Sequence, residues 1–156
     1  MTERRISLTL VLHNHQPVGN FGFVFEETWE QAYAPMLEAL ERHPGVRLGL
    51  HYTGPLLDWF KSDKPVAIER LRALVERDQV EVLGGGYYEP VLASLREDDR
   101  VGQLTKMADE IESLVGRRPG GAWLAERVWE PDVPKALAMA GYDYTIVDDA
   151  HFRAAA

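Results

Sequence analysis

Residues 121–131 read Gly-Ala-Trp-Leu-Ala-Glu-Arg-Val-Trp-Glu-Pro, and this stretch guides the interpretation of the whole chain. The apolar run ahead of Glu126 is typical of a buried strand, and Pro131 can continue neither a helix nor a strand ladder. Glu126 is therefore expected where a strand meets a loop, with Trp123 and Arg127 beside it. The stretch predicts a strand that ends on a carboxylate among aromatic side chains.

The same order, an apolar strand followed by a polar loop, recurs along the chain. Besides the strand that leads into Glu126, strands are predicted over residues 6–12, 46–50, 79–83 and 144–147. Amphipathic helices are predicted between them, over residues 25–42, 65–77, 98–114 and 133–140. Because strands and helices alternate, the fold class is predicted to be α/β with a parallel sheet.

Each predicted strand carries or precedes groups that can do chemistry. They are His13 and His15, His51, Glu81, Glu126, and Asp148 with Asp149. Parallel strands place their carboxyl ends at one edge of a sheet, where barrel enzymes hold their active sites. These groups are therefore expected to meet at one site, although His51 is interpreted as a hydrogen-bonded structural histidine at its strand end.

Three glycines, Gly84 to Gly86, follow the third predicted strand. Glycine adopts positive φ without steric cost, so this turn is expected to bend Tyr87, Tyr88 and Glu89 into the site. A phosphate loop is the weaker interpretation, because no G-x-G-x-x-G or GK[S/T] pattern is present. Glu81 lies within the strand itself, and a charge there is expected to face a polar site or a cation.

A carboxylate between indole rings suits a carbohydrate. Sugar C–H faces stack on aromatic rings, and an acidic group can attack or stabilise the anomeric carbon. The alternative is a structural Glu126–Arg127 ion pair beside core tryptophans, since such pairs are common at strand ends. The convergence of polar groups at the strand ends favours the functional interpretation.

Composition excludes several other classes of protein. The 156 residues suffice for one domain with a core, and the net charge of −8 with no basic stripe argues against a nucleic acid partner. Cysteine is absent, so neither disulfides nor thiolate metal sites can form. The first apolar segment is too short for a signal sequence or a membrane span. A cytoplasmic protein without a membrane partner is expected.

Three motifs together resemble glycoside hydrolase family 57, especially its 4-α-glucanotransferase and α-amylase members. They are HNHQP at 13–17, GGGYYEP at 84–90 and WLAERVWEP at 123–131. Residues 53–57 and 147–152 add to the resemblance, which extends through almost the entire chain. HxHQP alone is a weak signal, but the order and spacing of the three motifs make the resemblance specific.

The resemblance implies a retaining enzyme on a seven-stranded, TIM-like (β/α) barrel that acts on α-1,4-glucans of the maltooligosaccharide, starch or glycogen type, without a metal or other cofactor. It implies that Glu126 is the nucleophile that forms a covalent glycosyl-enzyme. It also implies that His15 and Glu81 line the sugar site nearest the scissile bond and that Trp123 is a stacking wall. The predicted substrate-binding residues are His13, His15, Glu81, Tyr88, Trp123, Arg127 and Asp148.

The resemblance stops short of a complete active site. The family's acid/base aspartate lies on a later strand, and no residue here matches it, because Asp148 and Asp149 match another segment. Retaining hydrolysis needs two carboxyls about 5–5.5 Å apart. Five strands do not close the barrel, and neither a sixth strand nor a returning helix is predicted after Phe152. Residues 1–156 are therefore expected to be the N-terminal part of the catalytic domain, inactive alone.

Two alternatives from other classes stay open. One is a metal-dependent carbohydrate deacetylase or mannosidase-like barrel, in which His13, His15 and Asp148 hold a divalent ion. Against it stands a structural interpretation in which His13 is bonded within its loop and only His15 meets the substrate. The other alternative is a non-catalytic glucan-binding fragment. Hydrolysis and transfer differ in how acceptor subsites compete with water, and those subsites lie in segments that this sequence lacks.

Overall fold

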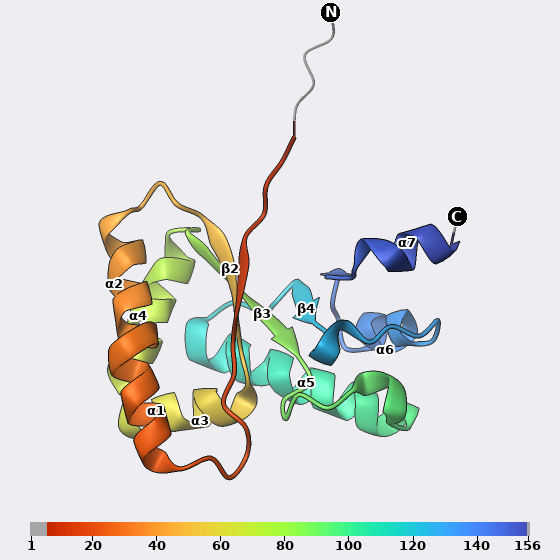
Figure 1. Ribbon diagram of the computed structural model, residues 1–156, viewed down its shortest axis with the longest axis horizontal. Helices are drawn as coiled ribbons and strands as arrows, with labels where there is room; N and C mark the ends of the chain where they lie inside the picture. The colour runs from red at the N-terminus through yellow and green to blue at the C-terminus, as the bar shows by residue number, and fades with distance from the viewer. Residues whose placement is uncertain (1–5, 156) are drawn as a thin grey trace, which may run out of the picture.

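The computed structural model describes residues 6–155, which form a five-stranded sheet flanked by helices (Figure 1). The strands lie in the order in which they occur along the chain, and every neighbouring pair is parallel. They are β1 (Val11–Asn14), β2 (Leu48–Tyr52), β3 (Val80–Gly85), β4 (Gly121–Trp123) and β5 (Tyr144–Thr145). The predicted α/β class with parallel strands is confirmed.

Helices lie between successive strands, and a last helix follows β5. They are α1 (Gly22–Thr28), a π-helical segment (Trp29–Tyr33), α2 (Ala34–Arg42), α3 (Gly54–Asp63), α4 (Pro65–Glu76), α5 (Glu97–Val115), α6 (Val133–Met139) and α7 (Asp149–Ala155). Short 3₁₀ turns cover Leu92–Ser94 and Ala125–Arg127. Helix α4 contacts α2, α3 and α5, and α5 contacts α6. Of the helices described, none has the length and apolar character that crossing a membrane requires.

Three helical features differ from the predictions, each for a local reason. The helix predicted over residues 25–42 is interrupted by the π segment, in which the Ala34 amide donates to the Trp29 carbonyl. The next residue, Pro35, has no amide hydrogen and cannot donate an α-helical hydrogen bond. Helix α3 is not predicted because Pro55 resembles a loop signal, yet proline is well tolerated in a first helical turn. Helix α7, also not predicted, ends in alanines, the strongest helix formers.

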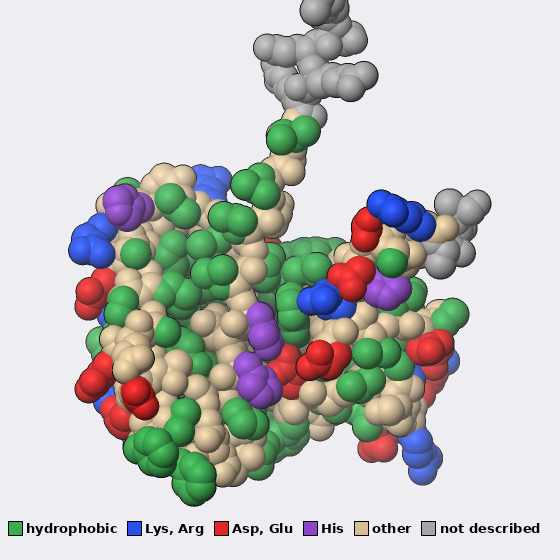
Figure 2. Space-filling view, in the orientation of Figure 1, with side chains coloured by type: hydrophobic (Ala, Val, Ile, Leu, Met, Phe, Trp, Pro, Cys, Tyr) green, Lys and Arg blue, Asp and Glu red, His purple; other side chains and the backbone are tan. Residues whose placement is uncertain are grey.

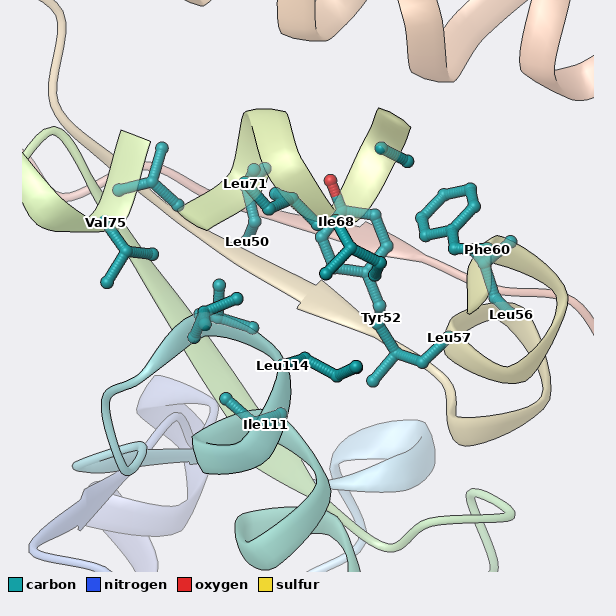
Figure 3. Close-up of a cluster of buried hydrophobic side chains, with 14 of the residues drawn as sticks. Leu50, Tyr52, Leu56, Leu57, Phe60, Ile68, Leu71, Val75, Ile111 and Leu114 are labelled. Atoms are coloured by element: carbon teal, nitrogen blue, oxygen red, sulfur yellow. The ribbon is translucent and has the colours of Figure 1, made fainter. Parts of the chain in front are cut away.

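The strand register gives the sheet two different faces. Tyr52 and Leu50 point to the face that the helices cover, and neither is exposed. There they pack with Phe60 of α3 and Leu71 of α4 in the main core, part of which appears in Figure 3. The opposite face carries His13, His51, Glu81, Leu83, Trp123 and Tyr144, because residues paired in parallel register point the same way. The predicted functional groups therefore lie mainly on the face away from the helices.

Gly85 allows β3, β4 and His51 to approach closely. A Cβ atom at this position would lie 2.7 Å from the Trp123 carbonyl oxygen and 3.2 Å from Nε2 of His51, and its φ is +153°. Strand β3 continues through Gly85, so the turn that is predicted over all three glycines begins only at Gly86.

We expect Gly85→Ala to lower the free energy of unfolding by about 1–3 kcal/mol, because the backbone of β4 cannot move away without breaking the sheet. The measurement is urea unfolding at neutral pH. Gly102→Ala is the matched control: Gly102 lies in α5 with nothing within 4 Å of the added Cβ. That variant should gain about 0.5–1 kcal/mol. Equal stability of Gly85→Ala and the unaltered chain would contradict the argument.

Candidate functional site

His13, His15 and Glu89 form the centre of the candidate site. His13 lies in β1, His15 follows this strand, and Glu89 follows β3. Nε2 of His13 is 3.1 Å from one carboxylate oxygen of Glu89, and Nδ1 of His15 contacts the other. The Glu89 side chain is only 10% exposed. We call these residues the His13–His15–Glu89 cluster. In the face of the molecule drawn in Figure 2, histidine and acidic side chains adjoin near the middle.

A cleft of about 320 Å³ opens beside the cluster and brings Glu126 into the same site. Its lining residues are His13, His15, Glu89, Val91, Ala125 and Glu126. Groups from the ends of β1, β3 and β4 thus converge, as the parallel arrangement predicts.

A turn of the backbone after β3 directs the Glu89 side chain to the cleft. Its amide bonds to the carbonyl of Gly86 at 2.9 Å, and its φ of 53° is left-handed, which turns the chain sharply. Glu89 is absent from the predicted substrate-binding set, although the glycine turn indicates that it bends inward. The signal that could have found it is its position in GGGYYEP, where it is the acidic residue of a loop that follows a central strand.

Tyr87 and Tyr88 are not among the residues that line the cleft, and the predicted substrate contact of Tyr88 stays a prediction. The Tyr87 hydroxyl donates to a carboxylate oxygen of Asp58 at 2.8 Å. The ammonium of Lys106 lies 3.8 Å from the Tyr87 ring centre and 4.4 Å from the Tyr88 ring centre, and it donates to the Tyr88 hydroxyl at 2.7 Å. These cation–π contacts to α5 hold both rings away from the cluster.

His13 lies between two flat partners. Its ring stacks on Trp123, with the ring centres 4.7 Å apart and an interplanar angle of 13°. The ring of His51 lies edge to edge with it, with the ring centres 4.9 Å apart and an interplanar angle of 17°. Trp123 therefore covers a face of His13, and it is not among the residues that line the cleft. Its predicted stacking on a sugar stays a prediction.

His51 is fully buried and bonds to His13 through the two Nδ1 atoms at 2.8 Å. Burial, together with the neighbouring His13 and His15, lowers the pKa of His51 to about 3, so this ring is neutral near pH 7. Burial also lowers the pKa of His13, while Glu89 opposes that shift. Nε2 of His51 has no hydrogen-bond partner within residues 6–155. The prediction of a hydrogen-bonded structural histidine therefore holds for one ring nitrogen only.

Glu126 is exposed and lies in the 3₁₀ turn that follows β4. Both Glu126 and Arg127 have a φ of 52°, a left-handed conformation that costs about 1–3 kcal/mol for each such residue. Arg127 donates to a carboxylate oxygen of Asp148 at 2.7 Å. Arg127 therefore forms its ion pair with Asp148, and not with Glu126 as the structural alternative expected. The predicted substrate contacts of Arg127 and Asp148 stay predictions, and the two residues lie side by side.

Glu81 lies apart from the cluster. It pairs with Gly49 near the start of β3, two positions before the Leu83–His51 pair, which corresponds to about 7 Å along the strand. There it shares a separate hollow of about 310 Å³ with Tyr144. Burial and the hydrogen bond with Glu81 raise the pKa of the Tyr144 hydroxyl. The structure thus does not bring Glu81 to the cleft, and its predicted sugar contact stays untested.

The cluster consists of side chains of the types that bind metal ions. One ligand atom from each of His13, His15 and Glu89 lies within 4.8 Å of the other two. Two imidazoles and a carboxylate are a zinc ligand set. The predicted ligand Asp148 instead forms the ion pair with Arg127. A divalent ion would therefore take Glu89 rather than Asp148 as its third ligand.

Comparisons with known proteins agree with this arrangement. A family model described as Glycosyl hydrolase family 57 matches residues 9–156. A 4-alpha-glucanotransferase of Thermococcus kodakarensis is 48% identical over 144 residues, 92% of this chain and 22% of that protein. An alpha-amylase of Pyrococcus furiosus is 47% identical over 151 residues, 97% of this chain and 23% of that protein. The crystal structure of 4-alpha-glucanotransferase from Thermococcus litoralis has a TM-score of 0.92 at 44% identity, covering 97% of this chain and 24% of that one.

The chain spans less than a quarter of the length of these relatives, so it resembles a part of each rather than the whole. Within that part, the match covers all five strands and the loops that carry the cleft. The family model covers nearly the entire sequence, and the resemblance of the three motifs is thereby confirmed. The chain belongs to glycosyl hydrolase family 57.

Proposed function

We propose that this chain supplies the nucleophile-bearing part of a retaining enzyme that acts on α-1,4-glucans. The observation that carries the proposal is the position of Glu126: an exposed carboxylate at the end of a parallel strand, on a cleft lined by His13, His15 and Glu89. The relatives named glucanotransferase and amylase supply the substrate class. An α-glucan is therefore the proposed partner.

The two carboxylates of the cleft differ in their surroundings. Glu89 is largely buried, and both of its oxygens contact imidazole nitrogens. Glu126 is exposed on the turn after β4. A nucleophile needs an oxygen free to approach the anomeric carbon, so Glu126 suits this role and Glu89 does not.

The acid that protonates the leaving oxygen is proposed to come from chain outside these 156 residues. Asp148 is engaged by Arg127, and the relatives are more than four times as long as the matched part. We propose that further strands complete a seven-stranded barrel around the face of the sheet that carries His13 and Trp123. The chain alone is then expected to lack turnover.

The first test is intact-protein mass spectrometry after incubation with a 5-fluoro α-maltosyl fluoride. Fluoride leaves with little acid assistance, so Glu126 should form a stable covalent adduct of one maltosyl unit. Glu126→Gln should abolish this mass gain. Glu130→Gln, an exposed carboxylate four residues further along, is the matched control and should keep it. A folded chain that forms no adduct would refute the assignment.

A second test uses natural substrates. With maltoheptaose the chain alone should release no sugar above background, because a glucosyl leaving oxygen requires protonation. Thin-layer or anion-exchange chromatography after long incubation is the measurement. Sustained release that is lost in Glu126→Gln would show that an acid is present within the chain, against the proposal.

A metal-dependent deacetylase-like site is the second candidate, since the geometry of the His13–His15–Glu89 cluster favours it. Under the glucan proposal, trapping by the fluoride should be unchanged after dialysis against EDTA. Tight zinc binding, measured by calorimetry, combined with zinc-dependent release of acetate from an acetylated chitooligosaccharide would favour the metal-dependent candidate. Zinc that merely slows trapping would indicate an ion that competes with the sugar for the cluster.

A further inference from the structure

We infer that His51 is a positioning residue: its Nδ1–H donates to Nδ1 of His13, which fixes His13 in the tautomer whose Nε2–H donates to Glu89. The functional part of this inference rests on the proposed function. The tautomers themselves can be measured without any ligand.

The contact between the two histidines requires one proton. The Nδ1 atoms are 2.8 Å apart, so one of them carries hydrogen and the other accepts it. His51 is neutral near pH 7, because a second ring hydrogen would leave a buried N–H at Nε2 without an acceptor in residues 6–155, and burial also holds its pKa far below that value. It therefore has a single ring hydrogen, at either Nδ1 or Nε2, and the network around it decides which.

Suppose first that His13 supplies the proton. Neutral His13 would then present a bare Nε2 lone pair to the Glu89 oxygen at 3.1 Å, so that two acceptors would face each other. His51 would carry its hydrogen at Nε2, which is buried and finds no acceptor in residues 6–155. A buried donor without a partner is rarer than an under-used acceptor.

Suppose instead that His51 supplies the proton. Nε2–H of His13 then donates to one oxygen of Glu89, and His15 donates to the other through Nδ1. Only the Nε2 lone pair of His51 is left over. A doubly protonated His13 would satisfy both of its own contacts, but His51 would then accept at Nδ1 and carry its hydrogen at the buried Nε2, which has no acceptor in residues 6–155. The second arrangement therefore satisfies the most groups.

Several neighbours hold the chain of hydrogen bonds from His51 through His13 to Glu89, which we call the relay, in place. His13 and His51 are paired in register on adjacent parallel strands, so their rings emerge side by side on the same face. Trp123 lies flat against His13. Gly85 leaves room for the His51 ring, since a Cβ there would lie 3.2 Å from its Nε2. The ring of His51 is thus confined by close neighbours, and its position leaves Nδ1 directed at His13.

The relay has a direct use in the proposed reaction. Two N–H donors fix the orientation of the Glu89 carboxylate beside the cleft that Glu126 borders. Positive charge develops at the anomeric carbon in the oxocarbenium-like transition state. A fixed anion nearby stabilises that charge, so His51 would act on the reaction through His13 and Glu89 without touching the sugar.

Long-range ¹H–¹⁵N spectra of the histidine rings test the inference in the chain as it stands. The expected result is Nδ1–H for His51, Nε2–H for His13 and a single proton on each ring at pH 7. Nε2–H for His51, or two protons on His13, would overturn it. This readout does not depend on Glu126 or on glucan, so a failure of the proposed function leaves it intact.

Two variants extend the test to the reaction. His51→Asn places an amide N–H near the position of Nδ1, whereas His51→Phe keeps a ring without a donor. We expect His51→Phe to lose the Nε2–H tautomer of His13 and to slow trapping by the maltosyl fluoride by about tenfold or more. His51→Asn should restore both. Equal trapping rates in two folded variants, checked by thermal unfolding, would refute the positioning role.

Discussion

The parallel register between β1 and β2 is the constraint on which the rest of the site depends. It pairs His13 with His51 and points both rings away from the helices, while Leu50 and Tyr52 point into the core. A shift of one residue would reverse these faces, burying polar rings among leucines and exposing the core side chains. The apolar packing that stabilises the sheet therefore also determines where the histidines meet.

Much of this arrangement follows from the sequence because it depends on periodicity. Alternating strands and amphipathic helices indicate a parallel sheet, and parallel strands bring His13, His15 and Glu126 together at one edge. The π segment and helix α3 could not be predicted in this way, because each depends on how a single proline is accommodated in a helix. Local signals around Pro35 and Pro55 favour a break or a loop equally well.

The sequence does not determine which side chains after Gly84 to Gly86 reach the cleft. Spacing alone does not separate Tyr88 from Glu89, and the outcome depends on a left-handed turn at Glu89 and on Lys106 of α5, which holds both tyrosine rings. Glu81 shows the same limit in the other direction. It points to the predicted face, but its position along β3 places it beside Tyr144. Register and tertiary partners, rather than residue type, decide such cases.

Under the proposed function, the left-handed backbone at Glu126 and Arg127 places a cost in folding stability at positions that serve the reaction. Glycine populates that region freely, and asparagine does so more readily than glutamate or arginine, so either replacement should relieve backbone strain. Selection for a stable fold alone would thus move these positions towards small residues. Deep mutational scanning for stability and for glucan chemistry should give opposite rankings here, a mark of function that needs no knowledge of the substrate.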